Sequence, residues 1–165
     1  MSPRIVVGGV GQLYQGDLDI ARHALERLGE LPLDADVALE ELSYGAVAAA
    51  QRLQELAPEA LVLVGARQRG RPPGTVERRQ VGRLDLPPSM LQGYVADAVT
   101  GYVSLELTLA VGSTLGALPR DTTAIEVEPA LVGPSEALSP AAEQALERAL
   151  RLLRAELLRL GVFLE

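Results

Sequence analysis

The sequence predicts an α/β fold: three-layer α/β/α with a mostly parallel five-stranded twisted sheet flanked by helices on both faces. The first observation is an apolar run at residues 5–7 that ends in Gly8, Gly9 and Gly11 and precedes an amphipathic segment. Strand, glycine turn and helix form the unit of open α/β sheets. The second is the unbroken apolar run at 60–66, ALVLVGA, which is typical of a central strand covered on both faces. The third is the alternation of strand-like and helix-like segments along the chain.

The first half of the chain supplies two strand–helix units. We expect a strand at 4–8 and a helix at 18–28, with Asp17 as its N-cap, Asp19 in its first turn and Gly29 closing it. The next unit joins a strand at 37–42 to a helix at 46–56, which Ser43 would cap and Pro58 would end.

The second half completes the sheet and adds two helices. Residues 75–81 are polar enough for an edge strand or an extended loop, and 105–118 favour a helix that Gly116 and Pro119 end. A last strand at 122–127 leads through a loop to a helix that begins at Ser139 and Pro140 and runs to about residue 160. The predicted buried stripe of this helix is Leu146, Leu150, Leu153 and Leu157.

Composition narrows the classes of function. We expect one domain, residues 1–165, because this length suits a single core. A net charge of −7 argues against nucleic-acid binding, which needs a basic face. With no Cys and one His, neither thiolate nor His-rich metal sites are available. We see no signal peptide and no apolar run approaching the ~18 residues of a membrane span, so we expect a cytoplasmic protein without membrane contact. Arg67, Arg69 and Arg71 are interpreted as a solvated loop, with an anion or partner contact as the alternative.

The segment from Gly9 to Ala21, GVGQLYQGDLDIA, resembles the first motif of the nickel-iron hydrogenase maturation endopeptidases, roughly G-x-G-N-x-L-x-x-D-(D/E)-G-x-G. The resemblance continues in the same order along the chain. The matching segments are residues 61–66 with the P-G-T turn at 73–75, residues 101–119, residues 125–129, and the L-S-P of 138–140.

This resemblance implies a metal-dependent endopeptidase scaffold without its metal ligands. The acidic, aspartate and histidine ligands of the family fall on Leu18, Gly65 and Gly101, whose side chains cannot bind a metal. We therefore expect no metal, no cofactor and no catalytic residue, and a role in binding a hydrogenase large subunit or another maturation protein. The candidate pocket is Gly9, Gly11, Gln12, Asp17, Leu18, Asp19, Glu41, Gly65 and Gly101.

Two alternatives stay open. The chain would be an active maturation peptidase, cleaving the C-terminal tail of the large subunit, if Asp17, Asp19 or Glu41 had taken over as ligands. It would be a small-anion or nucleotide binder if the glycine turn cradled a phosphate. Tyr14, however, stands where a dinucleotide fingerprint needs its third glycine, and no Gly-Lys-Ser/Thr follows. The sequence contains no G-x-S-x-G motif, which argues against a serine hydrolase. We interpret His23, the one histidine, as solvated.

Overall fold

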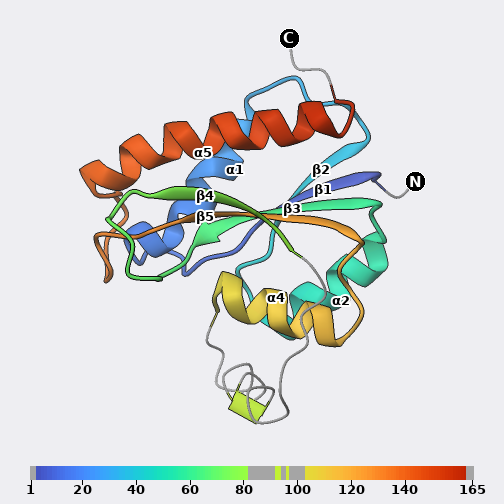
Figure 1. Cartoon of the computed structure of the whole chain (residues 1–165), viewed down its shortest axis with the longest axis horizontal. Helices are drawn as coiled ribbons and strands as arrows, with labels where there is room; N and C mark the ends of the chain where they lie inside the picture. The colour runs from blue at the N-terminus through green and yellow to red at the C-terminus, as the bar shows by residue number, and fades with distance from the viewer. Residues whose placement is uncertain (1–2, 82–91, 94–95, 97–102, 163–165) are drawn as a thin grey trace.

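A computed structural model describes residues 3–81, 92–93, 96 and 103–162. Five strands form one sheet in the order β2-β1-β3-β5-β4 (Figure 1). Their bounds are β1 Ile5–Gly9, β2 Val37–Glu41, β3 Ala60–Ala66, β4 Val76–Gln80 and β5 Asp121–Val127. All neighbours pair in parallel except β4, which runs antiparallel to β5 at the edge. The predicted mostly parallel sheet is confirmed, and the edge strand lies where the polar segment 75–81 indicated.

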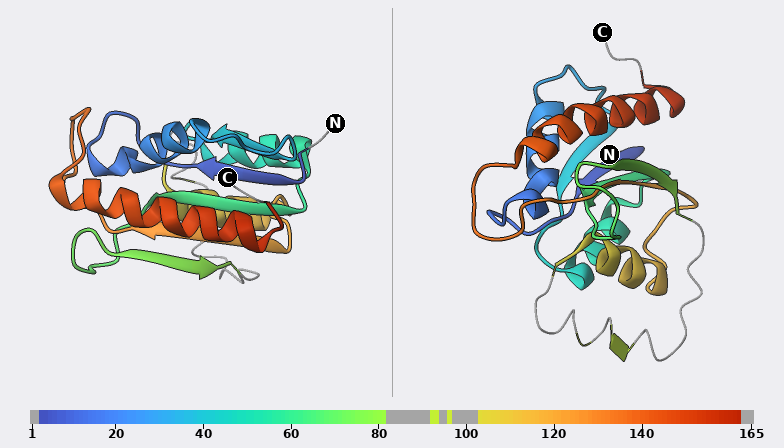
Figure 2. Two further views of the ribbon diagram at one scale, coloured as in Figure 1. Left: turned by 90° about the horizontal axis from the view of Figure 1, so that it is seen from above. Right: turned by 60° about the vertical axis from the view of Figure 1, so that its left-hand side comes forward.

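Helices cover both faces of this sheet, as Figures 1 and 2 show. The helices are α1 Ile20–Gly29, α2 Ala46–Leu56, α4 Leu105–Thr114 and α5 Pro140–Arg159, and a 3-10 turn, η1, spans Asp17–Asp19. One apolar core joins α1 and α5 to the sheet, and a second joins α2 and α4 to its other face. The predicted α5 stripe of Leu146, Leu150, Leu153 and Leu157 is buried in the first core. Among the described residues, no helix is both long and apolar enough to cross a bilayer.

The chain order creates a crevice between β1 and β3. From β1 the chain passes through α1 to β2 on one side, whereas β3, reached through α2, pairs with β1 on the other. Such a reversal of strand order leaves a gap at the carboxyl ends of the two strands, where open α/β sheets bind ligands. The loops after β1 and β3 and the first turn of α4 meet at this end.

Candidate functional site

A cavity of about 340 Å³ lies at the crevice between β1 and β3. Its wall combines the turn after β1, the end of β3 with its loop, and the start of α4. The lining residues are Gly11, Gln12, Leu18, Ala66, Arg67, Gln68, Val103, Ser104, Leu105, Glu106 and Leu107. Of the predicted pocket residues, Gly11, Gln12 and Leu18 are therefore on the wall. Gly101 lies outside the described residues.

Hydrogen bonds within the protein hold the turn after β1. Val10 N–H donates to the Val64 carbonyl at 3.0 Å, and Gly11 N–H donates to Ser43 Oγ at 2.9 Å. Gln12 N–H donates to the Leu18 carbonyl at 3.0 Å, so that carbonyl approaches Gly11 closely; a Cβ on Gly11 would lie 2.3 Å from it. The sequence predicts that Ser43 caps α2. In the structure Ser43 instead supports the turn after β1, and the N-cap of α2 is Gly45. The N–H groups of Val10, Gly11 and Gln12 therefore already donate to protein acceptors.

Two positions to which the resemblance assigns metal ligands, Leu18 on the wall and Gly65 beside it, carry no coordinating side chain. Leu18 contributes a branched alkyl side chain. Gly65, next to the wall residue Ala66, packs so tightly that an ideal Cβ would lie 2.4 Å from the Val10 carbonyl oxygen. An aspartate at position 65 would therefore require the backbone to shift.

Asp17 does not cap α1, contrary to the prediction. Its carboxylate is fully buried and accepts from Ala130 N (2.8 Å), Leu131 N (2.9 Å), Ser139 N (2.8 Å) and Ser139 Oγ (2.7 Å). Burial by itself raises the pKa of Asp17, but the bonds from Leu131, Ser139 and Ala130 outweigh it and lower that pKa below its ordinary value. Asp17 therefore clamps the loop before α5 and is not part of the cavity wall.

Asp19 is also buried, so the prediction of a simple first-turn charge is incomplete. Its Oδ2 accepts from Tyr14 N at 3.0 Å and from Arg22 Nε at 2.8 Å, whereas Oδ1 is buried with no hydrogen-bond partner among the described residues. The Arg22 guanidinium lies 5.0 Å from the centre of the Tyr14 ring. Tyr14 has a φ of 61°, an uncommon conformation for a residue with a side chain. Together, Asp19, Arg22 and Tyr14 hold the turn between β1 and η1 in its conformation.

The other predicted site residues lie off the cavity wall. Glu41 is exposed and its Oε1 accepts from Ser43 N at 3.0 Å. Gly9 lies against α1, where a Cβ would meet Leu25 at 2.7 Å. His23 is half-buried instead of solvated, and its Nε2 lies 3.4 Å from an Arg22 nitrogen.

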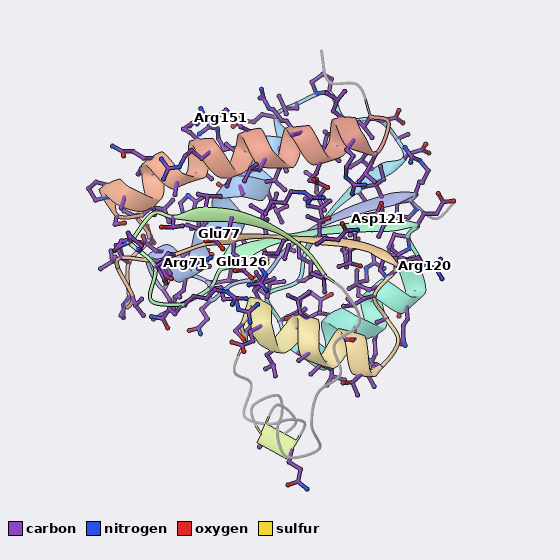
Figure 3. The ribbon with its side chains drawn as sticks, in the orientation of Figure 1. Arg71, Glu77, Arg120, Asp121, Glu126 and Arg151 are labelled. Atoms are coloured by element: carbon purple, nitrogen blue, oxygen red, sulfur yellow. The ribbon has the colours of Figure 1, made fainter. Side chains whose placement is uncertain are left out.

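The interpretation of Arg67, Arg69 and Arg71 as a solvated loop is wrong. These three side chains converge on Glu126, which is 0% exposed, through contacts of 3.0, 2.8 and 3.2 Å respectively. Burial raises the pKa of Glu126, but Arg69 and Arg67 outweigh it and lower that pKa. Figure 3 shows Arg71, Glu77 and Glu126 together at one end of the sheet.

Glu128 completes this arginine cluster. It is also buried, and it accepts from the backbone N–H groups of Arg69 (2.8 Å) and Arg71 (3.0 Å) and from Arg71 Nε (3.1 Å). The loop after β3 is therefore fastened to the end of β5. Sequence reasoning missed this role, although two glutamates at the end of an apolar strand are a signal that partners are needed.

Exposed apolar side chains gather on two loops at the same end of the sheet. The residues are Leu13 and Tyr14 after β1, and Leu131 and Val132 after β5. The loops are joined by Gly16 N to Ser135 O at 3.1 Å, Asp17 N to Leu131 O at 2.8 Å, and Ser135 N to Tyr14 O at 3.0 Å. We call these four side chains the apolar rim.

The donor groups of the described residues do not fit a nickel site. The described residues contain no group of three or more His, Cys, Asp or Glu that could hold a metal ion. The Asp17 carboxylate is occupied by four donors, Glu41 is bonded to Ser43, and Asp19 offers one free carboxylate oxygen. Nickel favours nitrogen and sulfur donors more than magnesium or calcium do.

Solved structures share this fold. The hydrogenase maturating endopeptidase HybD from E. coli is 22% identical over 98% of this chain and 96% of its own, with a TM-score of 0.76. A hydrogenase 2 maturation peptidase from a Thaumarchaeota archaeon is 23% identical over 93% and 97%, with a TM-score of 0.68. The NiFe hydrogenase maturation protease HycI from Thermococcus kodakarensis is 23% identical over 96% and 94%, with a TM-score of 0.62.

No protein-family profile and no curated protein sequence matches the chain. The likeness therefore lies in the three-dimensional arrangement and extends over nearly the whole length of each chain. The chain has the fold of the hydrogenase maturation endopeptidases, as the resemblance of its motifs implied.

Proposed function

We propose that this chain is a hydrogenase maturation protease-like protein without a working nickel site, which acts in the cytoplasm as a binding or assembly factor. Its partner would be a hydrogenase large subunit or a related maturation protein. One observation carries the proposal: at two ligand positions the site has an alkyl side chain, Leu18, and a glycine, Gly65, whose missing Cβ would collide with a backbone carbonyl. In this proposal the fold is kept, while the two described positions that the resemblance assigns to ligands offer no coordinating side chain.

The apolar rim supports a binding role. Tyr14 is 53% exposed although its backbone conformation is unfavourable, and Val132 is 50% exposed on the adjoining loop. Exposed apolar groups that adjoin one another are typical of protein contact surfaces. The Asp17 clamp fixes the second loop relative to the first, which reduces the ordering cost of binding.

The test uses the purified chain and a purified large-subunit precursor from the same organism. We expect the two to co-elute from a sizing column, and the precursor to keep its full mass after incubation. Replacing two rim residues, Leu13→Ser with Val132→Ser, should abolish co-elution. The matched control is Leu158→Ser, because Leu158 is exposed on α5 away from the rim.

Three results would overturn the proposal. Loss of the precursor's C-terminal tail would identify an active maturation endopeptidase with relocated acidic ligands. Co-elution that survives the double rim substitution, or no co-elution at all, would remove the binding role assigned to this surface.

A further inference from the structure

Strand β4 forms a free border of the sheet. It stands last in the strand order, and the left view of Figure 2 shows it as the outermost strand on its side. Its five residues, Val76–Gln80, pair with β5 in one antiparallel register without a bulge. The N–H and C=O groups along the outer edge of such a strand can pair with a further strand.

The hydrogen bonds to β5 show which backbone groups of β4 lie at this outer edge. Glu128 N–H donates to the Thr75 carbonyl at 2.8 Å. Val81 N–H donates to the Thr122 carbonyl, also at 2.8 Å. Along an antiparallel strand, residues that bond to the neighbouring strand alternate with residues whose N–H and C=O point the other way. The odd-numbered residues of β4 therefore bond to β5. The residues whose backbone groups point outward are Val76, Arg78 and Gln80.

The charged side chains of β4 are divided between the two faces of the sheet, because successive residues of a strand point to opposite faces. Arg78 lies on the α5 face, where its guanidinium binds the buried carboxylate of Glu156. Glu77 and Arg79 lie on the other face, and both are exposed. Glu77 Oε2 is 3.1 Å from Arg71 Nη1. This face of the border thus carries an acidic and a basic side chain at equal distances in sequence from Arg78.

We propose that β4 pairs with β4 of a second copy of this chain, antiparallel about a two-fold axis at Arg78, which joins the two sheets into one. The outward backbone groups then match, because Arg78 faces its own copy and Val76 faces Gln80. Glu77 of each copy faces Arg79 of the other. These two positions form no hydrogen bonds in the new ladder, so their Cα atoms lie only about 4.5 Å apart and the side chains meet closely. Opposite charges placed in this way stabilise a pair of strands.

The charges select this register over its neighbours. Moving the axis by one residue keeps the outward backbone groups matched but brings Glu77 opposite Glu77, or Arg79 opposite Arg79, and like charges in facing positions repel. With the axis at Arg78, the like pair is Arg78 itself. Its Cα atoms are farther apart, about 5.5 Å, and each guanidinium is neutralised by Glu156 of its own copy.

Charged residues on an edge strand commonly keep other strands away. Here the two signs occupy positions that exchange under a two-fold rotation, so the same charges favour a second copy of this strand. The surface is therefore specific for the chain itself rather than for any extended peptide. The proposal does not depend on a hydrogenase-related partner.

Sedimentation equilibrium over a dilution series tests this proposal. We expect the average mass of the wild-type protein to rise from that of one chain, 17.5 kDa, toward twice that value as the concentration increases. Arg79→Glu places carboxylates opposite each other at both contact positions and should weaken association by about tenfold or more. The matched control is Arg151→Glu, which makes the same change of charge on the outer side of α5 in Figure 3 and should associate like wild type.

Two further samples test the pairing of Glu77 with Arg79. The double variant Glu77→Arg with Arg79→Glu exchanges the two charges, so it restores both opposite pairs and should associate like wild type. A mixture of the single variants Glu77→Arg and Arg79→Glu should form a mixed dimer, because one strand is then basic at both positions and the other acidic. Neither single variant should associate as strongly alone.

Circular dichroism shows whether each variant is folded, since Glu77→Arg loses the contact with Arg71. If that variant is unfolded, Gln80→Pro decides: it removes an outward N–H and no bond to β5, and it should associate less than its control, Gln80→Ala. The proposal is overturned if wild-type protein stays a single chain at every concentration, or if Arg79→Glu associates like wild type. It is also overturned if the folded double variant and the mixture do not recover association, or if Gln80→Pro associates as strongly as Gln80→Ala. Failure here leaves the hydrogenase proposal intact, because that proposal is judged by co-elution and precursor mass.

Discussion

The substitution Asp17→Asn measures how strongly the buried clamp stabilises the fold. Asn has nearly the same volume, so the perturbation is confined to charge and hydrogen bonding. Oδ2 accepts from Ala130 N, Leu131 N and Ser139 Oγ, and Oδ1 accepts from Ser139 N at 2.8 Å. With the amide oxygen at the Oδ2 position, the new NH₂ group faces the Ser139 N–H, and two donors meet.

The magnitude follows from these contacts. Leaving one buried N–H unpaired costs about 1–3 kcal/mol. The remaining hydrogen bonds are weakened because Asn is neutral, and hydrogen bonds to ionised groups are roughly twice as strong as neutral ones. We therefore expect Asp17→Asn to lower the free energy of unfolding by about 3 kcal/mol.

Urea unfolding followed by far-ultraviolet circular dichroism measures this difference. The matched control is Asp34→Asn, because Asp34 is exposed and its single bond, from Asp36 N at 3.0 Å, can be kept by the amide oxygen. The control should change the free energy of unfolding by less than about 0.5 kcal/mol. A similarly small change for Asp17→Asn would refute the clamp.

Three further predictions concern stability. Gly65→Ala should lower the free energy of unfolding by about 1–3 kcal/mol in urea titration, because the added Cβ meets the Val10 carbonyl, whereas Gly29→Ala meets only Leu39 at 3.8 Å and serves as control. Ser104→Ala should cost about 1 kcal/mol in the same assay, because Ser104 Oγ accepts from Leu107 N at 3.0 Å at the start of α4; no loss would contradict this cap. Melting temperatures measured against pH should fall in acid. The buried carboxylates have pKa values in the folded protein that lie below the ordinary 3.8 of Asp and 4.5 of Glu. Their stabilisation is therefore fully present above the ordinary pKa values and is lost as the pH falls through the lowered pKa values of the folded state. A melting temperature that stays constant through this acid range would contradict the third prediction.

Local sequence signals were sufficient for most of the fold. The strand at 60–66 and the helix at 46–56 have the predicted bounds, because an unbroken apolar run and a helical repeat followed by Pro58 are properties of neighbouring residues. The first helix begins at Ile20 instead of residue 18, because the preceding residues form a 3-10 turn. That turn depends on partners far away in the chain.

The candidate site was predicted less well for the same physical reason. Asp17 has the side chain of a good N-cap, yet its acceptor oxygens are used by donors 113 to 122 residues away. The loop arginines appear solvated in sequence, because Glu126 and Glu128 stand more than fifty positions further on in an apolar strand. Leu18, Gly11 and Gln12 line the cavity because the turn after a parallel strand meets the carboxyl edge of the sheet.

Nickel titration of the purified chain by calorimetry tests the central claim most directly. That claim is that the scaffold of a maturation endopeptidase is retained, whereas Leu18 and Gly65 stand at positions that the resemblance assigns to metal ligands. We predict no heat of binding with an affinity in the micromolar range, and no rise in melting temperature when nickel is added. Stoichiometric binding of nickel with micromolar affinity would contradict the claim.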